Sequence, residues 1–199
     1  METAAYWTAL VTVTAVPPFV LFWFFVHPFT RHWRKLGPAK AYLLLFTIVA
    51  IMMLAISHFR APLLRIHFAV SWPLTVLAVL LFLTSLYIGT LHFRRLGPAA
   101  TLGFPQLSAR QYPGKLVTDG IYAYIRHPRY VQVGLGLAAL ALFTNYLAVY
   151  LIAAAYLPII YLVVLLEERE LKNRFGSEYE QYSRRVPRFM PTLSRTRRG

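Results

Sequence analysis

The feature that most constrains the fold is a series of five long apolar stretches, at residues 6–26, 41–57, 69–91, 131–144 and 146–166. As a helix, the uncharged first stretch would extend about 31 Å, which is roughly the thickness of the hydrocarbon core of a bilayer. Hydrophobic residues make up 58% of the 199 residues, against roughly 45–50% in an average soluble domain. The pattern predicts an all-α, polytopic membrane protein with about five transmembrane helices.

The charged residues lie almost entirely outside these stretches, and most are cationic, with 21 Lys and Arg against 7 Asp and Glu. If the stretches cross the membrane in turn, only Arg60 and Arg65 fall on one side, and the other 19 cations fall on the opposite side. The positive-inside rule then predicts an outside N-terminus and a cytoplasmic C-terminus, in a cell inner membrane or the endoplasmic reticulum. Because the cations mark orientation, we expect no nucleic-acid partner.

We expect a single domain over residues 1–199, in which residues 1–91 form three N-terminal spans. Residues 92–199 then hold a cytoplasmic cofactor-binding loop, a helical hairpin and a C-terminal tail. The hairpin is expected because only Asn145 separates the last two apolar stretches. The chain has no cysteine, which excludes a disulfide, a thiolate metal site and a cysteine nucleophile. We expect no metal.

Three local signals mark helix ends in the C-terminal half. Pro128 is suited to the first position of a helix, with His127 near its cap. Gly176 is suited to ending the long helix that continues the last apolar stretch. Ser177 and Glu180 have the spacing of a capping box for a second, short helix.

The chain also contains a short internal repeat, which we call the echo. Residues 32–39 read His-Trp-Arg-Lys-Leu-Gly-Pro-Ala, and residues 92–99 read His-Phe-Arg-Arg-Leu-Gly-Pro-Ala. Each run follows a stretch that exits to the predicted cytoplasmic side. The favoured interpretation is an aromatic and basic anchor at the membrane surface, followed by a Gly-Pro break. A duplicated substrate-docking element is the alternative.

Two clusters have the chemistry of a site. Arg126 and His127 precede the fourth stretch, where a helix N-terminus attracts anions. Glu167 and Glu168 end the fifth stretch, where a helix C-terminus disfavours negative charge. Glu168 has Lys172 four residues on as a pairing partner, whereas Glu167 has no such cation.

The hairpin brings these clusters to the same membrane face. From Pro128 to Asn145 a helix rises about 26 Å, and from Asn145 to Glu167 about 33 Å. The two clusters therefore end at similar depth. They predict a pocket with arginine, histidine and tyrosine on one wall and carboxylates on the other, which suits a zwitterionic cofactor with hydroxyl groups.

Two motifs in the last 40% of the chain resemble those of the isoprenylcysteine carboxyl methyltransferase and phospholipid methyltransferase superfamily. That family's pattern is Arg-His-Pro-x-Tyr-x-Gly, a hydrophobic hairpin, Glu-Glu, and a Phe-Gly-x-x-Tyr-x-x-Tyr tail. The chain matches it with Arg126-His127-Pro128-Arg129-Tyr130, with Glu167-Glu168, and with Phe175-Gly176-Ser177-Glu178-Tyr179 followed by Tyr182. Gln132 stands where the family has its glycine, and Gly134 follows two residues later.

The resemblance implies an integral membrane methyltransferase that uses S-adenosylmethionine and needs no metal. Its acceptor would be lipid-like or a small hydrophobic molecule, such as a prenylcysteine carboxylate, a phospholipid amine or a thiol, and membrane lipids would be partners. The resemblance also assigns residues, with Arg126 and Glu167 as the catalytic pair. The implied cofactor contacts are His127, Tyr130, Tyr122, Glu167 and Glu168.

Two other functions fit parts of the sequence. An NADPH-dependent sterol-type membrane reductase would share an Arg-His pair, an acidic pair and a tyrosine-rich tail, but Pro128 and the spacing to Tyr130 favour methyl transfer. A non-enzymatic basic membrane protein would need no carboxylates opposite Arg126 and His127. A transporter is disfavoured because no charge interrupts the five apolar stretches.

Overall fold

We describe a computed structural model that covers residues 2–26, 29–69, 71–101 and 115–191. All regular elements in these ranges are helical, and the only β-type pairing among them is an isolated bridge between His67 and Tyr146. The all-α expectation is therefore confirmed. The helices are α1 (Glu2–Val26), α2 (Thr30–Leu36), α3 (Pro38–His58), α4 (Arg60–Leu63), α5 (Trp72–Thr101), the 3-10 helix η1 (Gly120–Ala123), α7 (Pro128–Thr144), α8 (Leu147–Phe175) and α9 (Ser177–Arg185).

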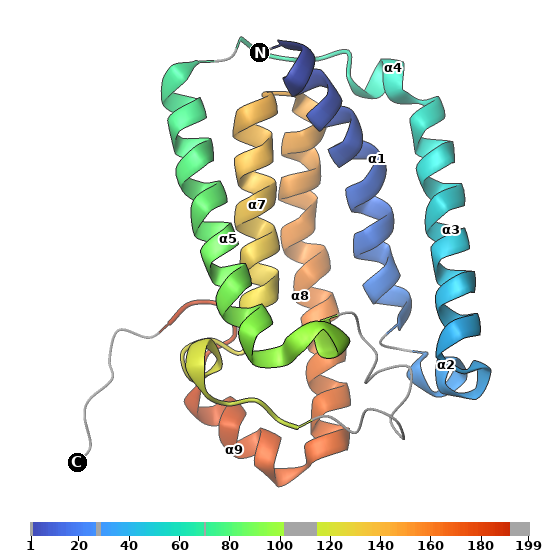
Figure 1. Cartoon of the computed structure of the whole chain (residues 1–199), viewed down its shortest axis with the longest axis vertical. Coiled ribbons are helices and arrows are strands. Elements are labelled where there is room, and N and C mark those ends of the chain that lie inside the picture. The colour runs from blue at the N-terminus through green and yellow to red at the C-terminus, as the bar shows by residue number, and fades with distance from the viewer. Residues whose placement is uncertain (1, 27–28, 70, 102–114, 192–199) are drawn as a thin grey trace.

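The five longest helices run side by side, with the N-terminus at one end of the bundle and α9 at the other (Figure 1). Helix α7 packs between α5 and α8, and α1 contacts α3, α7 and α8. Four of the five, α1, α3, α5 and α8, are long and apolar enough to cross a membrane. Helix α7 has 17 residues, or about 26 Å, so a fifth span remains a prediction.

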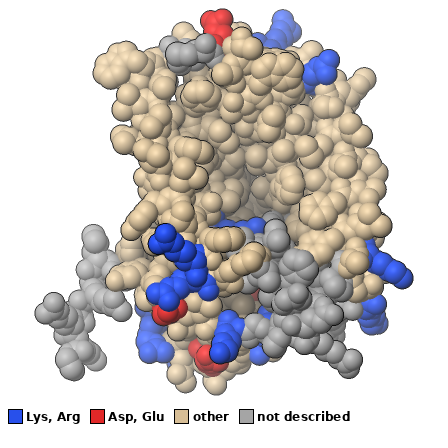
Figure 2. Space-filling view, viewed as in Figure 1, with Lys and Arg blue, Asp and Glu red and all other residues tan. Residues whose placement is uncertain are grey.

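The surface of the bundle is apolar along most of its length. Figure 2 shows a broad band without charge, with Lys and Arg gathered mainly at the end that carries α9. Large apolar side chains of α3 and α5 are exposed, for example Leu43, Leu54 and Trp72, which are 71–78% exposed. Such extensive exposed apolar surface indicates contact with lipid.

The connection between α7 and α8 depends on Asn145. Its backbone is left-handed, with φ of 56°, a conformation that asparagine tolerates better than most residues. The Asn145 side chain donates a hydrogen bond to the Ala69 carbonyl (2.7 Å) and accepts one from the Tyr150 hydroxyl (2.9 Å). These bonds fix the turn, and the turn sets where the two helices end at the opposite face.

The two copies of the echo have a similar backbone conformation but differ in their surroundings. Gly37 has φ of 80° and Gly97 has φ of 72°, and each precedes a proline that begins a new helical segment. Both glycines have a φ that side chains disfavour. His32 is exposed, whereas His92 is 3% exposed and shares a hydrogen bond with the Tyr122 hydroxyl.

The predicted capping box is wrong. Helix α8 ends at Phe175 and Gly176 follows it as expected, but Gly176 is also the N-cap of α9. Ser177 is thus already the first helical residue, and no side chain caps α9. The positive φ of Gly176 (55°) allows one residue to end one helix and begin the next.

Small residues let α5 and α7 approach closely. A Cβ placed on Gly89 would lie 2.7 Å from Nε2 of Gln132, so the absence of a side chain at position 89 makes room for the Gln132 amide. The Ser85 hydroxyl donates a hydrogen bond to the Gln132 carbonyl at 2.9 Å. Gln132, the departure from the family pattern, is therefore matched by a space on the neighbouring helix.

This match predicts a coupled pair of substitutions. Gly89→Val should lower the melting temperature, because overpacking a close helix contact costs about 1–3 kcal/mol. Gln132→Ala, added to Gly89→Val, should restore most of the loss. Thermal unfolding of the purified protein in detergent measures both effects, with Leu80→Val at an exposed position of α5 as the control. Equal destabilisation with and without Gln132 would contradict the match.

Candidate active site

The site begins where the C-terminal segment lies against the start of α7. Pro128 is the first residue of α7 and His127 is its N-cap, as predicted. The backbone N–H of Arg126 donates to the Pro187 carbonyl (2.9 Å), and that of His127 donates to the Arg188 carbonyl (3.1 Å). These two bonds hold residues 187–188 beside residues 126–127.

The carboxylate of Glu168 joins the three segments that meet here. Its Oε1 lies 3.0 Å from Nη2 of Arg126 and 3.2 Å from Nε2 of His127. Arg188 donates through Nε to both carboxylate oxygens (3.1 Å each) and through Nη2 to Oε2 (2.9 Å). The Glu168 side chain is only 7% exposed, so its charge is compensated by these three groups.

The expectation that the two glutamates stand at a helix C-terminus is wrong, because α8 continues to Phe175, seven residues beyond Glu168. The cluster instead explains how a carboxylate can be buried within α8. Burying a lone charge is costly, but paired and hydrogen-bonded charges can be accommodated. With donors from three side chains, Glu168 has little capacity left for a ligand. Its geometry is that of a group that positions Arg126, His127 and Arg188.

Glu167 lies on the other side of His127. Nδ1 of His127 is 3.6 Å from Oε2 of Glu167, while its Nε2 faces Glu168. Burial lowers the pKa of His127, but the hydrogen bonds and charges of the two carboxylates outweigh burial and leave the pKa above its ordinary value. The site therefore favours the imidazolium form, in which both ring nitrogens carry a proton.

A layer of tyrosines surrounds the two glutamates. A hydrogen bond links Tyr130 to Glu167, and Tyr122 shares a hydrogen bond with His92 (2.9 Å). The Tyr182 hydroxyl donates to the Tyr122 carbonyl at 2.7 Å, tying α9 to η1. Burial raises the pKa of both Tyr122 and Tyr182, so these hydroxyls stay protonated at neutral pH.

The structure brings the predicted residues into one site. Arg126, His127, Glu167, Glu168 and Tyr130 lie in direct contact with at least one other member. Tyr122 joins them through the electrostatic field of Glu167.

Sequence reasoning missed three residues of this site. Arg188 is the main partner of Glu168, and His92 and Arg129 act electrostatically on the same region as Glu167. His92 did occupy a marked position, because it begins the second copy of the echo. The matching residue of the first copy, His32, is exposed and lies outside the site. Arg188 stands in the run Val186-Pro187-Arg188-Phe189, which also resembles the family, but the resemblance assigned it no role.

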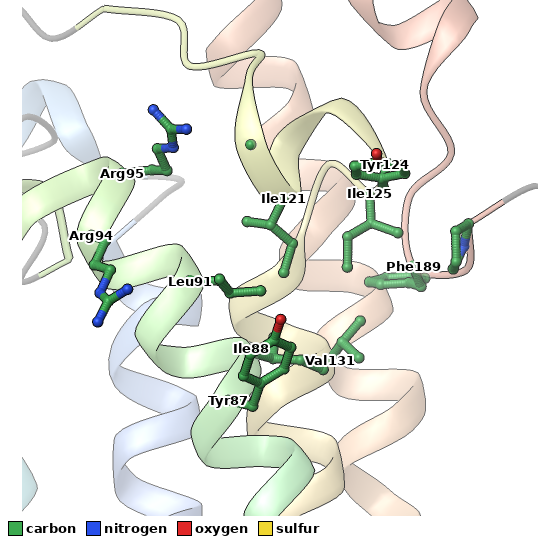
Figure 3. A pocket seen from close by; sticks show the side chains of 12 residues that line it. Tyr87, Ile88, Leu91, Arg94, Arg95, Ile121, Tyr124, Ile125, Val131 and Phe189 are labelled. Atoms are coloured by element: carbon green, nitrogen blue, oxygen red, sulfur yellow. The ribbon is translucent and has the colours of Figure 1, made fainter.

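An apolar cavity of about 760 Å³ opens beside the cluster (Figure 3). Figure 3 shows Tyr87, Ile88 and Leu91 on one side and Ile125 and Phe189 on the other, with two arginines beyond Leu91. These arginines are Arg94 and Arg95, and Arg95 pairs with Asp119 at 2.8 Å. Phe189 lines the cavity, and the centre of its ring lies 6.1 Å from that of the His127 ring, so the cavity and the cluster are neighbours.

Within the described residues, no group of three or more His, Asp or Glu is arranged to hold a metal ion. The side chains that meet at Glu167 and Glu168 are instead cations, hydroxyls and carboxylates. Such a set suits a ligand that carries charges of both signs.

The fold and this site define a class of protein: helical membrane proteins with a buried charged cluster and an apolar cavity at one end of the bundle. Residues 74–178 match the profile of the phospholipid methyltransferase family. This is more than half of the chain, and it includes α7, α8 and their charged ends. The chain belongs to the phospholipid methyltransferase family.

Curated relatives share part of this region. The chain is 37% identical over 87 residues to the protein-S-isoprenylcysteine O-methyltransferase of Schizosaccharomyces pombe, covering 43% of this chain and 37% of that protein. It is 41% identical over 80 residues to the cobalt-zinc-cadmium resistance protein CzcN of Cupriavidus metallidurans, covering 40% of this chain and 37% of that protein. It is 36% identical over 80 residues to methanethiol S-methyltransferase 1 of Bradyrhizobium diazoefficiens, covering 40% of this chain and 27% of that protein. The matched part thus spans 27–37% of the length of these relatives.

The ion cluster predicts a strong effect of Glu168→Gln on stability. The substitution keeps the shape of the side chain but leaves Arg126 and His127 buried without their carboxylate, which costs about 3–5 kcal/mol. Glu178→Gln, at an exposed position of α9, changes the same charge and should cost less than about 1 kcal/mol. Chemical unfolding in detergent measures both. Similar losses in the two variants would show that the cluster does not carry the stability.

His127 predicts a pH dependence. Because its folded pKa is raised, its stabilising contribution is complete below the unfolded value of about 6.5 and is lost as pH rises through the folded pKa. The gap in melting temperature between the wild type and His127→Gln should therefore be largest in acid and shrink in alkali. Thermal scans from about pH 5.5 to about pH 9 test this. A gap that widens with pH would reverse the assignment.

Proposed function

We propose that this protein transfers a methyl group from S-adenosylmethionine to a lipid-like or small hydrophobic acceptor at the cytoplasmic face of a membrane. The observation that carries the proposal is the buried charged cluster between the start of α7 and Glu168 of α8, beside an apolar cavity whose Phe189 contacts His127. Membership of the phospholipid methyltransferase family supports it. Two of the relatives are named as methyltransferases.

The residues around Glu167 fit the proposed cofactor chemically. S-adenosylmethionine presents a carboxylate, an ammonium group, ribose hydroxyls and a cationic sulfonium. Glu167 offers an acceptor for the positive and hydroxyl groups, and it lies near enough to Tyr122, Tyr130 and His92 to interact with each. Arg129 acts on the same three side chains, so a cation for the ligand carboxylate is also nearby.

We assign the two glutamates different tasks. Glu167, with His127, Tyr130 and Tyr122, would contact the cofactor. Glu168, filled by its three protein donors, would hold Arg126 and His127 in place. Arg126 would thus organise the site through Glu168.

The cofactor supplies an activated methyl group on a sulfonium. The positive charge disperses as the methyl moves, so the protein needs to align the acceptor and exclude water more than to donate or accept protons. The buried tyrosines and Phe189 exclude water in this scheme.

The apolar cavity lined by α5, η1, Val131 and Phe189 would take the acceptor. Its apolar wall suits a hydrocarbon portion, and Arg94 lies at its rim, where an anionic end could be held. This favours an amphiphilic acceptor over a small polar one. The gathering of cations at the α9 end supports an orientation with this face in the cytoplasm.

The proposal predicts that purified protein binds S-adenosylmethionine and does not bind NADPH. Glu167→Gln should weaken the binding at least about tenfold, because one charge-assisted contact is lost, while Glu178→Gln should bind as the wild type does. Isothermal titration in detergent measures these affinities. NADPH binding without S-adenosylmethionine binding would replace methyl transfer with the reductase alternative.

The variant Val131→Phe tests acceptor binding independently of cofactor binding. It should narrow the apolar cavity and reduce transfer of labelled methyl to membrane-extract lipids, with cofactor affinity unchanged. Wild-type transfer with this variant would remove the acceptor from that cavity, and unchanged cofactor binding in Glu167→Gln would remove Glu167 from the cofactor site.

A further inference from the structure

A second cavity, of about 500 Å³, lies on the C-terminal segment and is rich in arginine. Phe189 lines both this cavity and the apolar one, so the two are neighbours with different walls. Its wall includes four guanidinium groups, those of Arg126, Arg184, Arg185 and Arg188. None of these takes part in the apolar cavity.

The cations of this cavity exceed their acidic partners. Among the described residues, the carboxylate bound to them is that of Glu168, which pairs with Arg126 and Arg188. Arg185 donates to the Gln181 carbonyl, a neutral acceptor, at 3.2 Å. Four guanidinium groups around one carboxylate leave an excess of positive charge that an anion would neutralise.

Arg126 supplies an independent sign of a ligand. Its side chain is 9% exposed, and its Nε is buried with no hydrogen-bond partner among the described residues. A buried donor left unpaired on a charged group is costly. The same side chain lines the arginine cavity, so an acceptor bound there would lie beside a guanidinium group that the protein leaves incompletely satisfied.

The remaining wall indicates where the anion comes from. Tyr161 of α8 lines the cavity, and the Arg188 guanidinium lies 5.8 Å from the centre of its ring. Leu157 and Leu162, on either side of it in sequence, are 65% and 52% exposed and belong to the apolar surface of α8. The cavity thus lies where a basic rim meets a surface suited to acyl chains.

We propose that this cavity binds the phosphate of an anionic membrane phospholipid. Arg126 and Arg188 hold the phosphate at the buried end, Arg184 and Arg185 hold it at the exposed end, and the acyl chains run along α8. The bound lipid is not the methyl acceptor, which lies in the apolar cavity. The inference stands on the geometry of the arginine cavity and does not depend on methyl transfer.

The test compares two double variants that remove the same charge from the same end of the bundle. Arg184→Gln/Arg185→Gln changes the cavity, whereas Arg169→Gln/Lys172→Gln changes exposed residues of α8 outside it. Delipidated protein in neutral detergent is titrated with phosphatidylglycerol, and binding is followed by native mass spectrometry. We expect about a tenfold loss of affinity in the first variant and less than about a twofold loss in the second. Equal losses, or none, would overturn the proposal.

Two further arms identify the ligand and probe the buried end. Phosphatidylcholine should bind more weakly than phosphatidylglycerol, because it carries no net charge, and millimolar inorganic phosphate should not displace the lipid. Displacement by phosphate with the same sensitivity to Arg184 and Arg185 would make this a free-anion site and overturn the lipid assignment.

Arg126→Lys keeps a cation beside Glu168 but lacks the guanidinium Nε. It should therefore weaken phosphatidylglycerol binding in protein whose melting temperature shows that it is folded. Wild-type binding by that folded variant would overturn the role given to Arg126.

Discussion

The structure depends above all on the buried carboxylate of Glu168. It lies within hydrogen-bonding distance of Arg126, His127 and Arg188, which come from the start of α7 and from the C-terminal segment. Removing this carboxylate would leave its cationic partners uncompensated in a region with little access to water. The cluster therefore requires that the hairpin ends and the tail meet in one arrangement, and the two backbone bonds from residues 126 and 127 to the tail fix that arrangement.

Adjacent glutamates on one helix can serve different purposes because successive residues point about 100° apart. Glu168 faces the C-terminal segment, and Arg188 of that segment donates to its carboxylate. Glu167 faces His127 and the tyrosines. His127 lies between them and contacts both carboxylates, so the structural cluster sets the orientation of the ring that faces the proposed cofactor site. A site held in this way is positioned by the fold and not by the ligand.

Much of this arrangement could be predicted from the sequence, because its causes are local or periodic. Helix lengths on either side of Asn145 placed Glu167 level with His127, and Pro128 marked the start of α7. Arg188 could not be assigned, because its contact depends on how an irregular tail returns across residues distant in sequence, which no periodicity records. The capping box failed for a related reason, since the freedom of Gly176 moved the start of α9 by one residue. Gln132 shows the same limit, because its space is provided by Gly89 on another helix.

The cations of this chain differ in meaning according to their burial. Among the described residues, several cations lie exposed at the end of the bundle that carries α9, where a single charge contributes little to stability. Arg126 is different because its side chain is 9% exposed, so its guanidinium must be matched atom by atom. Glu168 pairs with its Nη2, the buried Nε has no hydrogen-bond partner among the described residues, and the side chain lines the arginine cavity. In a chain with a net charge of +14, Arg126 therefore says more about a bound ligand than the exposed cations described around it.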